Sequence, residues 1–195
     1  MASTAHEDIV VRLQEFFKVP NNGVVDDPPI VVSGQVRHYA PGGNRDEMSP
    51  DACVRPNMTF VPKPTTSTVI PRPPGDKSGN PHARIMCEVA VGQSVGELGR
   101  KTMTAKLYRQ GMAVQRWDFG NIKKHSRDPI TDPPGCNAPN LAAYQITIPI
   151  NEVFWDPPFP IPPGYTPAIP LNIVGINFVV DLYRIQRVAL KAQTP

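Results

Sequence analysis

Proline constrains this chain more than any other residue type, because it accounts for 25 of the 195 residues. Its ring fixes φ and removes the backbone N–H, so helix interiors and central strands tolerate it poorly. We therefore expect neither an all-helical bundle nor a doubly wound parallel sheet. Hydrophobic residues make up 40% of the chain and the net charge is only +3, a composition typical of a folded core. The length fits a single domain.

The N-terminal arm, residues 1–20, contains the clearest helical pattern. Thr4 and Glu7 have the spacing of a capping box, and Pro20 is a stop signal. Between them, the apolar residues that fall on one face of a helix are Ile9, Val10, Leu13, Phe16 and Phe17. We predict a short amphipathic helix over residues 5–18, whose apolar stripe must pack against its own domain or a neighbour.

Beyond the arm, apolar and polar residues alternate with a period of two, as in half-buried strands of antiparallel sheets. The segments that carry this pattern are 32–39, 84–91, 143–150 and 174–181. Shorter strand candidates lie at 58–61, 66–70, 103–109 and 112–119. The sequence therefore predicts a mainly β protein, in which residues 21–195 form one antiparallel β-sandwich of jelly-roll-like arrangement.

The C-terminal segment, residues 181–195, allows two interpretations. Arg184, Arg187 and Lys191 have the spacing of one helical face. Alternatively, the preceding strand runs on through Ile185. We favour a strand to about residue 186, followed by a short basic tail.

Proline-rich connections that are long for hairpin loops span residues 40–57, 71–82, 128–140 and 155–170. Proline restricts the unfolded chain, so ordering such loops costs less entropy than their length suggests. Long ordered loops usually carry function or contact a partner. Residues 154–170 also contain several aromatic rings, which suit either a contact with another subunit or a cover for the domain's own edge strand. The aromatic residues expected at subunit contacts are Phe16, Phe17, Phe154, Trp155, Phe159 and Tyr165.

The segment 100–127 is basic and is interleaved with aromatic residues, as a groove for nucleic acid or another polyanion would be. The candidate polyanion-binding residues are Arg109, Arg116, Lys123, Lys124 and Arg127. The alternative is a solvated strand face followed by a basic loop, because strand alternation already explains the spacing. The same patch also suits an acidic surface on another subunit.

The sequence offers little support for a catalytic or metal site. The four histidines do not stand at metal-ligand spacing, and there is no CxxC or HExxH pattern. Gly92, Ser94 and Gly96 have the spacing of a GxSxG motif, but we interpret the glycines of this segment as a turn between strands. The three cysteines lie far apart, which suits buried thiols better than a disulfide framework. We therefore expect no catalytic residues, no metal and no cofactor. The N-terminus lacks a basic leader and no apolar stretch is long enough to span a membrane, which favours cytoplasmic synthesis without a signal peptide.

These features together favour a non-enzymatic structural protein that packs through proline-rich loops and arms into a homo- or hetero-oligomeric particle. Components of viral or phage shells would combine such properties, and the protein would then be part of a virion or a comparable particle. A polyanion-binding or nucleic-acid-binding module that uses residues 100–127 is the alternative. A β-sandwich that binds carbohydrate or lipid through its aromatic loops is a further one.

Overall fold

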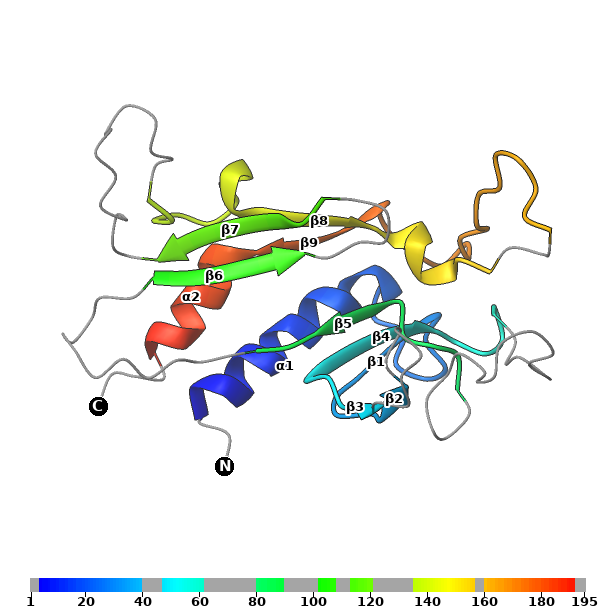
Figure 1. The fold of residues 1–195 in the computed structure, drawn as a ribbon, viewed down its shortest axis with the longest axis horizontal. Coiled ribbons are helices and arrows are strands. Elements are labelled where there is room, and N and C mark those ends of the chain that lie inside the picture. Colours follow the sequence, from blue (N-terminus) through cyan, green and yellow to red (C-terminus); the bar gives the residue numbers. More distant parts are fainter. Residues whose placement is uncertain are drawn as a thin grey trace. The chain divides into compact units, whose positions relative to one another are not determined.

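The computed structural model describes residues 4–39, 47–61, 80–89, 102–107, 113–120, 135–156 and 160–191 (Figure 1). These residues belong to two compact units. Unit 1 holds the described residues of 1–12, 90–147 and 179–195, and unit 2 holds those of 13–89 and 148–178. The helix α1 and the strands β8 and β9 each begin in one unit and end in the other.

The helix α1 spans Thr4–Lys18, which confirms the predicted N-terminal helix. Its buried positions include Ile9, Val10 and Phe17, all members of the apolar stripe. Glu7 lies in the first turn and Lys18 in the last, so both charges complement the helix dipole. A 3-10 turn, η1, follows over Val19–Asn21 and contains the stop signal Pro20.

Unit 2 contains a three-stranded antiparallel sheet in the order β1-β4-β5 (Figure 1). The strands are β1 (Ile30–Ser33), β4 (Ala52–Pro56) and β5 (Ile85–Cys87). Ile30, Ala52 and Val54 are completely buried, so this sheet contributes to the core of unit 2. The short strands β2 (His38–Tyr39) and β3 (Glu47–Met48) form a separate antiparallel pair.

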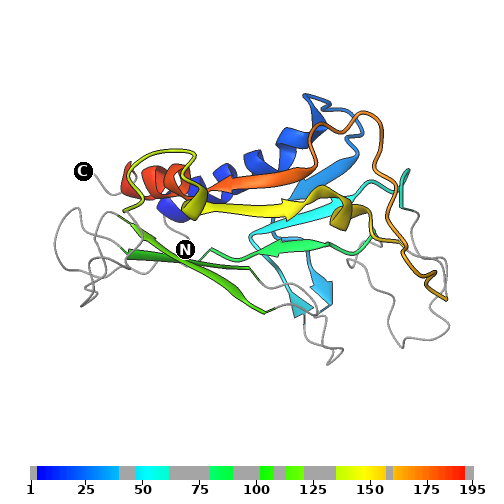
Figure 2. The ribbon, with the colours of Figure 1, turned by 90° about the horizontal axis from the view of Figure 1, so that it is seen from above.

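Unit 1 contains the antiparallel pair β6 (Thr102–Leu107) and β7 (Gln115–Gly120), in which Ala105 lies opposite Trp117. The helix α2 (Leu182–Lys191) packs against β7. The strands β8 (Gln145–Pro149) and β9 (Asn177–Asp181) pair with each other and run in opposite directions in Figure 2. Two further 3-10 turns flank β8: η2 (Ala142–Tyr144) before it and η3 (Ile150–Phe154) after it.

The described structure is thus rich in antiparallel sheet and begins with a short helix, as predicted. The strands expected at 103–109, 112–119 and 143–150 appear as β6, β7 and β8, with shifted ends. The expected strand at 66–70 lies outside the described residues. The predicted division into an arm, 1–20, and a single domain, 21–195, stays a prediction.

Some of the sequence predictions are wrong. The segment 182–191 is the helix α2 and not a strand with a basic tail. The predicted loop 40–57 contains β4, the central strand of its sheet, because Ala52, Cys53 and Val54 are all buried and so show no alternation. Residues 58–60 form a turn, in which the Asn57 carbonyl accepts a hydrogen bond from the Phe60 N–H.

Candidate functional site

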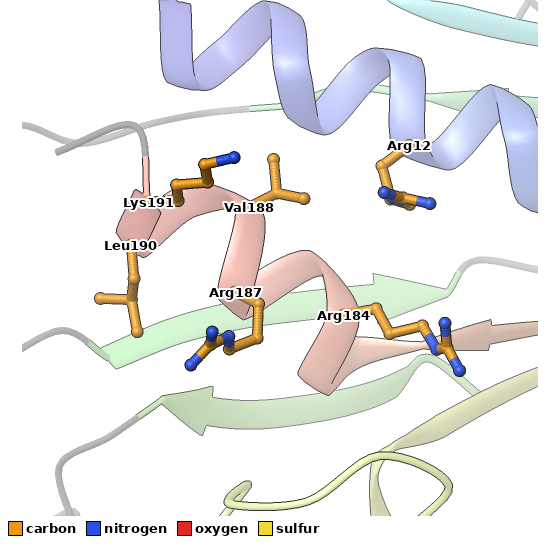
Figure 3. A pocket seen from close by; sticks show the side chains of 6 residues that line it. All are labelled: Arg12, Arg184, Arg187, Val188, Leu190 and Lys191. Carbon is orange, nitrogen blue, oxygen red and sulfur yellow. The ribbon is translucent and has the colours of Figure 1, made fainter. Parts of the chain in front are cut away.

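A basic pocket of about 500 Å³ lies in unit 1. Arg12 of α1 lines it together with five residues of α2, namely Arg184, Arg187, Val188, Leu190 and Lys191 (Figure 3). Arg12 extends from α1 toward α2, and Val188 and Lys191 extend from α2 toward α1 (Figure 3). Arg184 and Arg187 leave α2 in diverging directions (Figure 3). Four positive charges therefore surround one open pocket.

The buried carboxylate of Asp181 defines where α2 begins. Its Oδ1 accepts a hydrogen bond of 3.0 Å from the Tyr183 N–H, two residues on, as the side chain of a helix N-cap does. Its Oδ2 accepts a second hydrogen bond of 3.0 Å from the Asn140 N–H and lies 3.5 Å from Arg184 Nε. One carboxylate thus ends β9, starts α2 and anchors the loop before η2.

The helix α2 is strongly amphipathic. Leu182, Ile185 and Ala189 are buried together with the polar residue Gln186. The three basic residues Arg184, Arg187 and Lys191 are exposed and recur at helical spacing on the opposite side. Arg187 and Lys191 have no ion-pair partner among the residues that the structure describes.

A second surface feature belongs to unit 2 and is apolar. We call residues 19–25 and 169–176 the apolar loop pair. Of the fourteen exposed large hydrophobic side chains in the described part of the chain, half lie in these two short segments. They are Val19, Val24, Val25, Ile169, Leu171, Val174 and Ile176. Leu171 and Val25 are the most exposed, at 105% and 85%.

Hydrogen bonds fix the apolar loop pair in place. The Val174 N–H donates to the Pro20 carbonyl at 2.9 Å and joins the two segments. The buried Asn21 amide pairs with the backbone of Ile30: its Nδ2 donates to the carbonyl at 2.8 Å, and its Oδ1 accepts from the N–H at 3.0 Å. The Asn21 side chain thus satisfies both backbone groups of Ile30, as a neighbouring strand would, and joins the two ends of the loop 22–29. The exposed apolar residues are therefore held by ordered backbone.

The aromatic residues predicted as subunit contacts have different surroundings. Phe17 and Phe154 are core residues with exposed fractions of 1% and 3%, so in this fold they offer almost no surface to a partner. The Phe17 ring packs edge-on against Phe178, with 5.3 Å between centroids. Phe16 is half-buried, and Phe159 lies outside the described residues.

Trp155 and Tyr165 are the members of this set that reach the surface as a pair. Their rings meet edge-on with centroids 5.2 Å apart, and Trp155 is 43% exposed. Arg84 Nη2 donates a hydrogen bond of 2.7 Å to the Trp155 carbonyl and holds the start of the proline-rich segment. The role of these two rings as subunit contacts stays a prediction.

The basic segment 100–127 is described only in part. Arg109, Lys123, Lys124 and Arg127 lie outside the described residues. Arg116 is exposed on β7, but its guanidinium binds Asp118 Oδ1, with Nη2 at 2.8 Å. The same oxygen accepts a hydrogen bond from the Thr104 hydroxyl at 2.6 Å. Among the predicted polyanion-binding residues, Arg116 is the one that the structure describes, and its guanidinium is already bound to Asp118.

Two histidines and two cysteines lie near one another in unit 2. The His38 and His82 rings meet edge-on at 5.7 Å, and Cys53 Sγ is 3.9 Å from His38 Nδ1. Burial, with help from Arg84 and His38, lowers the pKa of His82 to about 4. Burial also raises the pKa of the Cys87 thiol to about 12, with the neighbouring Cys53 adding to the shift. Both groups are therefore neutral near pH 7.

The third cysteine, Cys136, is buried in unit 1, and burial beside Asp181 raises the pKa of its thiol to about 11. All three cysteines are free thiols. A thiol with such a raised pKa is a poor nucleophile, since the thiolate is the reactive form. The described residues contain no group of three or more His, Cys, Asp or Glu side chains arranged to hold a metal ion.

Comparisons of this chain with protein-family models, with characterised proteins and with solved structures find no match. Within the part of the chain that is described, no helix is both long enough and apolar enough to cross a membrane. The two surface features above are therefore interpreted from their own geometry.

Sequence reasoning missed both features in part. The helical spacing of Arg184, Arg187 and Lys191 was visible, and Asp181 was the N-cap signal that would have favoured a helix. Arg12 joins them only through the fold. The apolar loop pair has a weaker signal, namely valine, isoleucine and leucine residues within segments that prolines and glycines mark as loops.

Proposed function

We propose that the protein is a non-enzymatic assembly protein that forms a homo-oligomer through the apolar loop pair. The observation that carries this proposal is the concentration of exposed aliphatic side chains on backbone held in place by hydrogen bonds. Single exposed apolar residues are ordinary, but a concentration of them marks a contact surface. A second copy of the chain is the occupant we infer, because most oligomers of soluble proteins are homo-oligomers.

The ordered loops support the proposal energetically. Association costs free energy for every loop and side chain that must be ordered in the interface. The Val174–Pro20 and Asn21–Ile30 hydrogen bonds order this surface before a partner arrives. Valine, isoleucine and leucine also have few rotamers to lose. The raised pKa values of Cys87 and Cys136 are consistent with thiols that serve packing and not catalysis.

The test is native mass as a function of concentration, measured by light scattering after size exclusion. We expect a multiple of the 21.4 kDa chain mass for the wild type. Leu171→Glu combined with Ile176→Glu should shift the protein toward the monomer, because charges do not tolerate burial in an apolar interface. Val114→Glu is the matched control, since Val114 is 52% exposed but lies outside the apolar loop pair. A wild type that stays monomeric at every concentration contradicts the proposal.

The larger assembly remains part of the proposal. A virion-like or other shell particle would require further contacts beyond one interface, and Trp155 with Tyr165 supplies a second exposed apolar group in unit 2. The jelly-roll-like sandwich is likewise proposed, with the antiparallel sheets of each unit as its support. Electron microscopy of the oligomeric fraction tests the particle: closed particles would support it, and small discrete oligomers would contradict it.

A further inference from the structure

We infer that the basic pocket of unit 1 binds a small ligand that carries several phosphate groups. The pocket is lined by positive charge. Its basic residues are Arg12, Arg184, Arg187 and Lys191, and Arg184 lies 3.5 Å from the buried carboxylate of Asp181. Several cations around one concavity raise the local potential and concentrate anions there.

The chemistry of the side chains favours phosphate. Three of the four cations are arginines, whose planar guanidinium matches the oxygens of phosphate with two parallel hydrogen bonds. Lys191 adds a point charge on a flexible stem. The guanidinium of Arg187 and the ammonium of Lys191 are exposed on α2, so neither must leave a buried site to meet a ligand.

The arrangement of the cations indicates a ligand with more than one anionic group. Arg184 and Arg187 diverge from α2, while Arg12 comes from the facing side of α1 (Figure 3). Because these cations come from two helices and point in different directions, a chain of linked phosphates can contact more of them than a single phosphate can. The volume of about 500 Å³ lies within the range of small-molecule sites. Val188 and Leu190 add an apolar wall that suits an uncharged portion of the same ligand.

Asp181 fixes the start of α2 and the position of one basic side chain of the pocket, Arg184. The Asp181 carboxylate caps α2 and holds Arg184 at 3.5 Å, so the first of the three basic residues on α2 has a defined place. The later ones follow at helical spacing. The pocket belongs to unit 1, whereas the apolar loop pair belongs to unit 2, so this inference stands independently of the proposed oligomer.

The test is calorimetric titration of the full chain with tripolyphosphate at fixed ionic strength. We expect saturable binding that weakens as salt rises, because cation–phosphate contacts are screened. Arg187→Glu combined with Lys191→Glu should weaken binding by about tenfold or more, since charge-assisted hydrogen bonds are lost and repulsion is added. Arg37→Glu combined with Lys106→Glu is the matched control, because it changes net charge equally at exposed residues elsewhere. That control should leave the affinity within about twofold, as expected for a screened long-range effect.

Three parallel titrations identify the ligand class: orthophosphate, citrate and a short single-stranded oligonucleotide at equal phosphate concentration. Weaker binding of orthophosphate and citrate supports a multiply phosphorylated ligand. Citrate that binds as tightly as tripolyphosphate overturns the assignment to phosphate. An oligonucleotide that binds while tripolyphosphate does not overturns the small-ligand assignment. Equal losses in the pocket variant and in the control variant overturn the site. If the double variant unfolds, Lys191→Gln supplies the same comparison with a neutral side chain.

Discussion

The two surface features rest on one buried polar side chain each, and these two residues work in different ways. Asp181 in unit 1 and Asn21 in unit 2 are both 3% exposed. Asp181 caps the helix that begins at the next residue and also accepts a hydrogen bond from the Asn140 N–H, 41 residues away. Asn21 binds one residue nine positions on, with a donor and an acceptor that both pair with the backbone of Ile30. The difference shows that the charged helix surface is anchored by a carboxylate that only accepts hydrogen bonds, whereas the apolar loop surface is anchored by an amide that both donates and accepts.

Replacing Asn21 should produce the largest loss of stability. Asn21→Ala leaves the N–H and the carbonyl of Ile30, a residue with 0% exposure, without their partners. We expect the free energy of unfolding to fall by about 4 kcal/mol, because each buried unsatisfied backbone group costs about 1–3 kcal/mol. Urea denaturation measures this loss. Asn172→Ala, at an exposed position of the apolar loop pair, is the control and should change stability by no more than about 0.5 kcal/mol.

Asn21→Asp refines the same comparison. The carboxylate still accepts a hydrogen bond from the Ile30 N–H, but it places an oxygen against the Ile30 carbonyl in place of the amide donor. We expect destabilisation near neutral pH that is partly relieved in acid, where the protonated carboxyl donates to that carbonyl. A variant as stable as the wild type at neutral pH would show that the Nδ2 hydrogen bond contributes little to this loop.

Acid should destabilise unit 2 through His82, by a smaller amount. Its folded-state pKa is lowered from 6.5 to about 4, chiefly by burial, so protons bind the unfolded chain more tightly. The free energy of unfolding that depends on a neutral His82 is fully present above pH 6.5 and is lost as pH falls toward 4. Between neutral pH and about pH 4.5 the contribution amounts to about 2 kcal/mol.

The measurement is the free energy of unfolding of the wild type and of His82→Gln at both pH values. The decline on acidification should be smaller in the variant by that amount. Equal declines in the two proteins would show that the His82 ring is not buried as described.

The parts of the fold that the sequence predicted are those with local causes. The apolar stripe of α1 and the alternation in β6 and β8 are periodic patterns that need no tertiary information. The strand β4 was missed because burial on both faces removes the alternation and Pro56 resembles a loop signal. The helix α2 was missed because the apolar residues of β9 run directly into it, and only the cap at Asp181 separates them.

The candidate sites were less predictable than the fold for a physical reason. Local helical geometry places Arg184, Arg187 and Lys191 on one face of α2. Arg12 is far from them in the sequence and lines the same pocket only because of the fold. The pairing of Asn21 with Ile30 could not be predicted either, because asparagine is a common turn residue and its sequence context does not show which backbone it binds. Within the apolar loop pair, the sequence predicts a proline-rich loop at Ile169 and a strand at Val174 and Ile176, and their exposure follows from how the loops close.

Removing the cap of α2 should have the smallest effect on stability and the clearest effect on the basic pocket. Asp181→Ala takes away the acceptor of the Tyr183 and Asn140 N–H groups and the partner of Arg184. Asn140 is exposed, so its N–H can bond to water instead, and we expect the lost cap to lower the free energy of unfolding by about 1 kcal/mol. Asp181→Asn keeps an acceptor for the cap, although its NH2 then faces the Asn140 N–H, and should lose less. Because fraying of the first turn displaces Arg184, tripolyphosphate affinity should fall in the alanine variant even where the protein remains folded. If the affinity rises instead, Asp181 acts mainly by neutralising the pocket, and the contrast with Asn21 as two purely structural anchors fails.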